Sequence, residues 1–176
     1  MSSQKNVLHE AGTVEANALR LETGKAEQIV DALNTDLAAT YVLYHQLRKH
    51  HWNVEGAEYR DLHLFLGDAA ESAEEAADEL AERVQAIGGV PVSGPAALEE
   101  HAPVEYEGED VYDIRTSLEN DLETYGDIIE TVRDHVELAE NLGDHATAEM
   151  LQEQLVDLEE FAHTIDHFLG NDSLKR

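Results

Sequence analysis

The chain has 176 residues, and its 39 acidic and 11 basic side chains give a formal net charge of −28. This charge disfavours binding to nucleic acid or to an anionic membrane, because like charges repel at ordinary salt. The absence of cysteine excludes disulfides and thiolate chemistry. We find no signal-peptide pattern and no stretch of about 20 apolar residues. A soluble cytoplasmic protein is therefore expected.

Apolar residues recurring every three or four positions predict long helices, which argues against a disordered acidic chain. We expect a folded protein of a high-salt cytoplasm, where the repulsion between its charges is screened. Residues 1–24 lack this periodicity and are interpreted as an N-terminal arm. The helices are expected over about 25–51, 58–87, 110–141 and 145–169. The stripe of the third helix begins at Val111, and residues 171–176 are left as a C-terminal tail.

The connections between these helices indicate the topology. Two are short, whereas residues 90–109 contain all three prolines and the stretch "AALEEHA", which predicts a short helix. One long crossover is typical of the ferritin-like four-helix bundle, over residues 25–170. The alternative is an up-down bundle from which the proline segment merely loops out.

The stretch "AESAEEAADELAER" of the second helix is unusually acidic. Glu71, Glu75, Asp78 and Glu82 are spaced four, three and four residues apart, so they lie on one helix face. Like charges at this spacing destabilise a helix unless cations lie against them. One interpretation is a solvated acidic face, and the other is a surface that holds metal.

A length argument bears on the metal-binding interpretation. His63 and Asp78 are 15 residues apart on one predicted helix, which separates them by ~22 Å. They cannot share a metal within one chain, but they could share one if two copies of the helix packed antiparallel across a twofold axis. The alanines of the helix permit that close approach. Two imidazoles and two carboxylates suit a redox-active metal such as iron; zinc or manganese also fits, and calcium less well.

An intrachain ferritin-type site is the competing arrangement. It needs a Glu-x-x-His pair on each of two helices and a Glu from each of the other two. This chain has one such pair, Glu160 and His163, and the first helix supplies no Glu in its middle. The intrachain di-iron site is therefore incomplete.

The stretch "HHWNVEGAEYRDLHLFLGDAAESAEEAADELAERVQAIGGVP" resembles the Dps branch of the ferritins, and the likeness extends from the first helix to the fourth. The acidity resembles haloarchaeal members. The resemblance implies a hollow dodecamer that oxidises Fe(II) with hydrogen peroxide or O2 at two-iron centres between subunits and stores ferric mineral inside. It implies His51 and His63 of one chain, with Asp78 and Glu82 of its partner, as catalytic metal ligands, and Trp52 as the neighbouring aromatic residue.

Two features depart from the family pattern. Gly67 stands where the family often has an acidic residue, and we expect Glu75 or a water molecule to compensate at the second iron position. Family members that bind DNA often use a lysine-rich tail, whereas "MSSQKNVLHEAG" has one lysine. Since binding by counterion release needs many phosphate contacts, little or no DNA binding is expected.

Further residues carry weaker expectations. Glu71 and Glu74, with Glu75, are candidates for holding ferric ions as mineral nucleates, or form a solvated inner surface. Glu79 is expected to be a solvated charge, and Tyr41 and Tyr44 core residues. Asp144, His145 and Glu149 are candidates for lining a pore that passes Fe(II), although Asp144 is equally a candidate N-cap. His163 and His167 lie on one helix face and have either a metal role or an ordinary structural one. The other functions considered are a non-catalytic metal-binding scaffold and a nucleoid protein.

Overall fold

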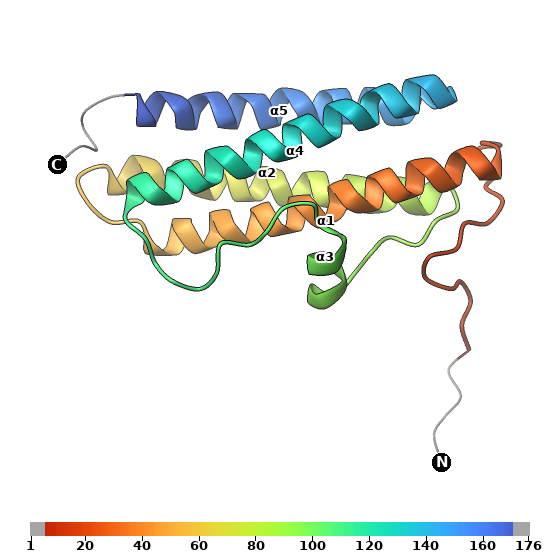
Figure 1. Cartoon of the computed structure of the whole chain (residues 1–176), viewed down its shortest axis with the longest axis horizontal. Coiled ribbons are helices and arrows are strands. Elements are labelled where there is room, and N and C mark those ends of the chain that lie inside the picture. The colour runs from red at the N-terminus through yellow and green to blue at the C-terminus, as the bar shows by residue number, and fades with distance from the viewer. Residues whose placement is uncertain (1–5, 171–176) are drawn as a thin grey trace, which may run out of the picture.

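A computed structural model of the chain describes residues 6–170, and within them every regular element is a helix. The helices are α1 (Thr23–Asn53), α2 (Tyr59–Ala86), α3 (Pro95–His101), α4 (Ile114–Leu142) and α5 (His145–Leu169) (Figure 1). The predicted all-helical fold is confirmed. No helix in the described part of the chain is long and apolar enough to cross a membrane. The predicted tail at 171–176 lies outside the described residues.

The four long helices form two antiparallel hairpins that pack together as a bundle. The pair α1 and α2 is joined by residues 54–58, and the pair α4 and α5 by Gly143 and Asp144. The crossover between the hairpins carries α3 and runs along the outside of α1 (Figure 1). This is the ferritin-like topology that the connection lengths predict.

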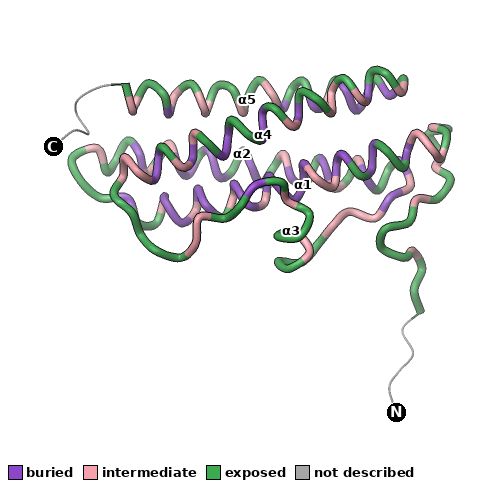
Figure 2. Tube along the Cα trace, in the orientation of Figure 1, coloured by how far each residue is buried: buried purple, intermediate pink, exposed green. Residues whose placement is uncertain are grey.

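Helix α1 is the most deeply embedded element. Its side chains are buried along nearly its whole length, because α2, α3 and α4 all pack against it (Figure 2). Helix α2 contributes small residues to the core, among them Ala69, Ala70, Ala73 and Ala77. Helix α5 is the most exposed of the four, and only a few of its residues are fully buried. Tyr41 and Tyr44 are half-buried against the core.

The start of the third long helix differs from the prediction. It begins at Ile114 rather than near residue 110, because the Asp113 carboxylate accepts a hydrogen bond from the Thr116 backbone N–H at 3.2 Å and caps the helix. Val111 therefore lies in the crossover, where it is 59% exposed, and is not part of the core stripe. The crossover is correspondingly longer than expected.

The segment before α1 contacts the far end of α2. The Glu15 backbone N–H donates to the Gly88 carbonyl at 2.8 Å. Gly88 has a φ of 93°, and a Cβ atom there would lie 2.1 Å from the Glu15 carbonyl oxygen. Glycine at this position thus both ends the helix and lets the N-terminal segment approach it.

Candidate metal centre

Two of the predicted ligands meet where α1 ends and α2 begins. His51 belongs to the last turn of α1, and His63 lies in the second turn of α2. Their rings stack with centroids 3.8 Å apart and planes inclined by 18°. Both residues are half-buried.

Reciprocal hydrogen bonds fix both rings. His51 Nδ1 donates to the His63 carbonyl at 2.6 Å, and His63 Nδ1 donates to the His51 carbonyl at 2.8 Å. A carbonyl oxygen can only accept, so each Nδ1 carries a proton, and in the neutral ring Nε2 carries the lone pair. Histidine ligands in metal sites are commonly oriented this way, by a second hydrogen bond from the nitrogen that does not bind the metal.

Neighbouring residues complete the support of this histidine pair. The Tyr59 ring stacks on His63, with centroids 5.1 Å apart. Gly67, one turn further along α2, faces His51. A Cβ atom at position 67 would lie 3.1 Å from His51 Cε1 and 3.2 Å from Nδ1, which is unusually tight. The His51 ring thus lies directly against the α2 backbone at this position.

The predicted carboxylate ligands lie elsewhere in the same chain. Asp78 and Glu82 are exposed on α2, which is unbroken from His63 to both of them. Within residues 6–170 no three His, Asp or Glu side chains gather closely enough to hold a metal ion. One chain therefore keeps the histidine pair and the two carboxylates apart.

The remaining acidic side chains of α2 face outward. Glu71, Glu74 and Glu75 are exposed, and their carboxylates make no hydrogen bond or ion pair within residues 6–170. Glu79 is also exposed, but its Oε2 accepts a hydrogen bond from Gln154 Nε2 at 3.2 Å. Glu79 was expected to be a fully solvated charge, but its carboxylate is hydrogen-bonded to a residue of α5.

At the start of α5 one pore candidate has a structural role. Asp144 is buried, and its carboxylate accepts hydrogen bonds from the Thr147 backbone N–H and from Arg83. Burial alone would raise the pKa of this carboxyl, but Thr147 and Arg83 outweigh it and lower the pKa below its usual value. His145 and Glu149 are exposed. Asp144 is thus the N-cap of α5.

The histidines near the end of α5 pair with each other. His163 Nε2 and His167 Nε2 are 3.0 Å apart, and both residues are exposed. Glu160 is exposed as well. The Glu-x-x-His pair of this helix therefore does not point into the bundle, in agreement with an incomplete intrachain site.

Residues 30–174 match the ferritin-like domain family. The DNA protection during starvation protein of Halobacterium salinarum is 67% identical over 175 residues, covering 99% of this chain and 96% of that protein. The chain belongs to the Dps family of ferritin-like proteins. The crystal structure of an archaeal Dps homologue from Halobacterium salinarum superposes with a TM-score of 0.94, at 66% identity over 99% of this chain and 98% of that one.

More distant Dps proteins share the fold. The structure from Vibrio cholerae, described as a member of a broad superfamily of ferritin-like diiron-carboxylate proteins, matches with a TM-score of 0.83. Its identity is 25%, over 94% of this chain and 99% of that one. A nutrient stress-induced DNA-binding protein of Synechococcus is 42% identical over 92% of each chain.

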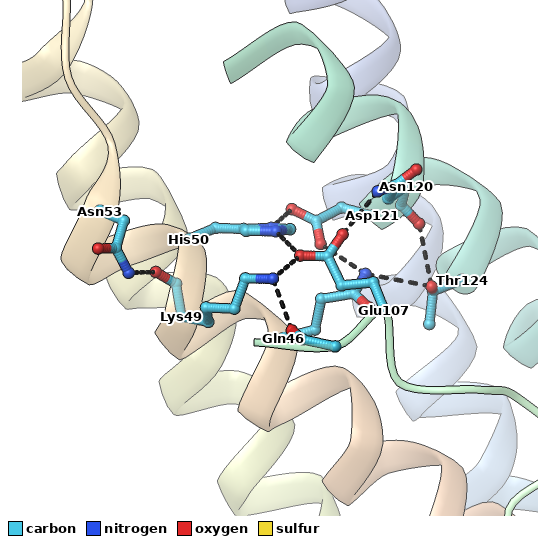
Figure 3. A network of polar contacts seen from close by, with 9 residues as sticks. Gln46, Lys49, His50, Asn53, Glu107, Asn120, Asp121 and Thr124 are labelled. Atoms are coloured by element: carbon cyan, nitrogen blue, oxygen red, sulfur yellow. Dashed lines mark hydrogen bonds and ion pairs between the residues drawn. The ribbon is translucent and has the colours of Figure 1, made fainter. Parts of the chain in front are cut away.

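This Dps protein also has a buried polar network beside the centre that sequence reasoning missed (Figure 3). His50 is 3% exposed. Its Nδ1 lies 2.8 Å from Asp121 Oδ2 on α4, and its Nε2 lies 2.5 Å from Glu107 Oε1 in the crossover. Burial alone would lower the pKa of His50, but the two carboxylates outweigh it and raise the pKa. His50 therefore ties α1 to both partners.

Further contacts surround the Glu107 carboxylate. Lys49 pairs with Glu107 and donates to the Gly108 carbonyl at 2.8 Å. Asn120 donates to Glu107 Oε2 at 2.6 Å (Figure 3). Burial alone would raise the pKa of Glu107, but Lys49, Asn120 and His50 lower it overall. No local sequence signal shows this network, because its members come from three segments far apart in the chain.

A second buried pair joins α1 to α4. Asp36 is 1% exposed, and His135 Nδ1 donates to its two oxygens at 2.8 and 2.9 Å. Burial raises the pKa of Asp36, and His135 offsets part of that rise. The middle of the first helix, which lacks Glu, thus supplies a buried Asp that the sequence analysis did not single out.

Proposed function

We propose that this protein is a cytoplasmic ferroxidase and iron store whose catalytic centres form between two copies of the chain. His51 and His63 of one copy and Asp78 and Glu82 of another would bind Fe(II) as substrate. The histidine pair carries the proposal: both rings are oriented through Nδ1, yet within residues 6–170 no third His, Asp or Glu side chain joins them closely enough to complete a metal site. A C2 dimer with antiparallel α2 helices would supply the missing ligands twice.

The chemistry of this ligand set suits iron. Imidazole and carboxylate together bind both oxidation states of the metal. Two Fe(II) ions would each lose one electron, and one hydrogen peroxide would accept both and become two hydroxide ions; O2 is the alternative oxidant. Consuming peroxide this way limits hydroxyl-radical formation, which fits relatives named for protection during starvation. The second iron, lacking a carboxylate at Gly67, would use Glu75 or water.

Storage would follow inside a homododecameric shell. Glu71, Glu74 and Glu75 are exposed and make no hydrogen bond or ion pair within residues 6–170, so they are available to hold ferric ions while mineral nucleates. Fe(II) would pass a pore near Asp144, where His145 and Glu149 are exposed. The exposed pair His163 and His167 is proposed as a further metal contact.

Mixing two inactive variants tests the inter-subunit arrangement. His63→Ala removes one half-site and Asp78→Asn with Glu82→Gln removes the other, so each variant alone should lose the fast phase of Fe(II) oxidation. When the two are co-assembled at random, half of the dimers pair unlike chains, and each of these has one intact centre out of two. About a quarter of the wild-type activity should return.

The contrary result is a mixture as inactive as its components, which would place all ligands in one chain. Unchanged kinetics in the Asp78→Asn, Glu82→Gln variant would reject these carboxylates as ligands, and metal binding without any peroxide-dependent oxidation would favour a non-catalytic scaffold. Native mass measurement after aerobic Fe(II) loading checks the storage proposal. The expected particle is a dodecamer loaded with many iron ions per subunit.

DNA binding is proposed to be weak or absent. Two relatives are named as DNA-binding proteins, but this chain has a net charge of −28 and only four lysines: Lys5, Lys25, Lys49 and Lys175. Gel shifts with duplex DNA across a range of salt concentrations test the point. A stable complex that persists at high salt would contradict the electrostatic argument.

A further inference from the structure

One arginine near the histidine pair has no partner among the described residues of its own chain. Arg48 lies in α1 and is half-buried. Its Nε atom is shielded from solvent and meets no acceptor within residues 6–170. By contrast, Arg83, Arg115 and Arg133 each pair with a carboxylate. A shielded polar group without a partner costs free energy, so this side chain is suited to an anion from outside its chain.

The position of Arg48 places it beside the proposed metal ligands. It precedes His51 by three residues, so the two side chains are neighbours on one face of α1. The His51 ring lies against α2 at Gly67. Trp52 follows Arg48 by one turn and is 68% exposed. This face therefore runs along the edge of α1 that borders α2, where a second molecule can reach it.

The register of the proposed dimer brings one particular carboxylate to Arg48. Helices α1 and α2 are antiparallel within a chain, and the proposed dimer sets its two α2 helices antiparallel, so α1 runs parallel to α2 of the partner. Arg48 lies three residues before His51. Glu75 likewise lies three residues before Asp78, and both steps are about 4.5 Å in the same direction. A dimer that brings Asp78 to His51 therefore also brings Glu75, which is exposed, to the level of Arg48.

We propose that Arg48 pairs with Glu75 of the second copy and acts as a positioning residue for the inter-subunit centre. A guanidinium suits a carboxylate at an interface, because it can donate two parallel hydrogen bonds. The pair would hold the partner helix in the register that brings Asp78 to His51. It would leave the second iron position to water, and mineral nucleation to the other exposed carboxylates of α2. The pairing rests on the proposed antiparallel dimer.

Charge reversal in two separate variants tests the pairing. Arg48→Glu sets two carboxylates against each other at both contacts of its own dimer, and Glu75→Arg sets two guanidinium groups against each other, so each variant should assemble poorly alone. A mixed dimer, however, contains one wild-type pair and one reversed pair. When the two variants are co-expressed, one of them with a short mass tag, native mass spectrometry should find only assemblies with equal numbers of both chains.

A control separates this pairing from a general charge effect. Glu123→Arg makes the same reversal at an exposed carboxylate of α4. Co-expressed with Arg48→Glu, it should assemble chiefly without the Arg48→Glu chain, because the control leaves that chain's repulsion in place. A random distribution of the two chains in the test mixture would overturn the pairing, and so would a mixture that does not assemble. A pair formed within one chain would give the same contrary results, since mixing cannot repair it.

Neutral substitutions give a second measurement that does not depend on repulsion. Arg48→Gln and Glu75→Gln should each lower the temperature at which the assembly dissociates, as followed by light scattering. The double variant should lower it no further than the larger single effect, because both changes remove the same contact. Additive shifts would contradict the pairing.

The oxidation assay distinguishes a wrong pairing from a wrong dimer. If assemblies with equal numbers of chains do not form, while mixing His63→Ala with Asp78→Asn, Glu82→Gln still restores oxidation, the dimer stands and the pairing of Arg48 is rejected. If that mixture is inactive as well, the antiparallel dimer is rejected together with the pairing.

Discussion

His50 and His51 are consecutive in the chain and lie on different sides of α1. Both ring nitrogens of His50 are occupied, one by Asp121 and the other by Glu107, and the residue is 3% exposed. Among the described residues, only Nδ1 of His51 has a hydrogen-bond partner, and the half-buried ring lies against α2. On the side of α1 that faces α4, both nitrogens of the histidine ring have partners in the same chain. On the side that faces α2, one ring nitrogen has no partner among the described residues.

Under the proposed function, the difference separates a structural histidine, His50, from a metal-binding one, His51. A buried ring with both nitrogens paired contributes to the fold, because any loss leaves a buried polar group unsatisfied. A ring that is oriented by one nitrogen and open at the other is prepared to bind something from outside its chain. Substitutions on the two sides should therefore change different measured quantities.

The largest effect on stability is expected on the His50 side. Glu107→Gln leaves buried Lys49 and His50 without their shared carboxylate, and breaking a buried pair costs about 3–5 kcal/mol. The midpoint of guanidinium unfolding, at fixed protein and salt concentration, should fall accordingly. Glu159→Gln is the matched control, because it removes an exposed pair with Arg133 and should cost at most about 1 kcal/mol. Equal shifts in the two variants would contradict the prediction.

The same network predicts a pH dependence. The pKa of Glu107 is lowered from its ordinary 4.5, so its contribution is present above pH 4.5 and is lost as the pH falls through the folded-state pKa. The pKa of His50 is raised from its ordinary 6.5, so its contribution is present below pH 6.5 and is lost as the pH rises through the folded-state pKa. The stability difference between wild type and Glu107→Gln should therefore be greatest between pH 4.5 and 6.5. Denaturation series from pH 5 to 9 would show it shrinking above pH 6.5, and a constant difference would be the contrary result.

On the other side of α1, activity rather than stability should change. His51→Ala removes one of the proposed Nε2 ligands, and the initial rate of Fe(II) oxidation should fall about 100-fold. The unfolding midpoint should move less than in Glu107→Gln, since His51 is only half-buried. Stopped-flow absorbance of the ferric product measures the rate. A variant that unfolds earlier but oxidises normally would reverse the assignment of the two histidines.

A smaller effect is expected at Gly67. The added methyl group of Gly67→Ala would press on the His51 ring at 3.1 Å and 3.2 Å. We expect the ring to shift and the oxidation rate to fall about 10-fold, with secondary structure retained. A rate equal to that of wild type would show that the ring accommodates the methyl group without loss of ligand geometry.

The matched glycine substitution should have the opposite sign. Gly126 lies inside α4, and a Cβ atom there meets nothing within 4 Å. Gly126→Ala should therefore stabilise the protein by about 1 kcal/mol, because alanine loses less backbone entropy in a helix. The unfolding midpoint should rise while the oxidation rate stays unchanged. A fall in the midpoint would point to a contact at position 126 made by another copy of the chain.

The long helices could be predicted because their apolar spacing reports a buried face directly. The predicted start of α4 was wrong because Val111 fits the apolar spacing of the helix although it lies before it. The helix begins after Asp113, whose capping role depends on local backbone geometry. The proximity of His51 and His63 could be predicted, because the stretch of sequence that contains both histidines resembles a known family. The partners of His50 and Asp36 were not, since hydrogen bonds between distant segments leave no periodic trace in the sequence.

Because α2 is continuous, it fixes the distance between the residues at its two ends. His63 and the carboxylates of Asp78 and Glu82 are fixed to one rod of 28 residues, so the two centres of a dimer cannot be adjusted one at a time. Inserting one residue between them would turn the carboxylates by about 100° and move them by about 1.5 Å. Both centres would be lost together. If the proposed centres form, the spacing along this helix would decide which chains can share them, and co-assembly with a relative would require the same number of residues between its histidine and its carboxylates.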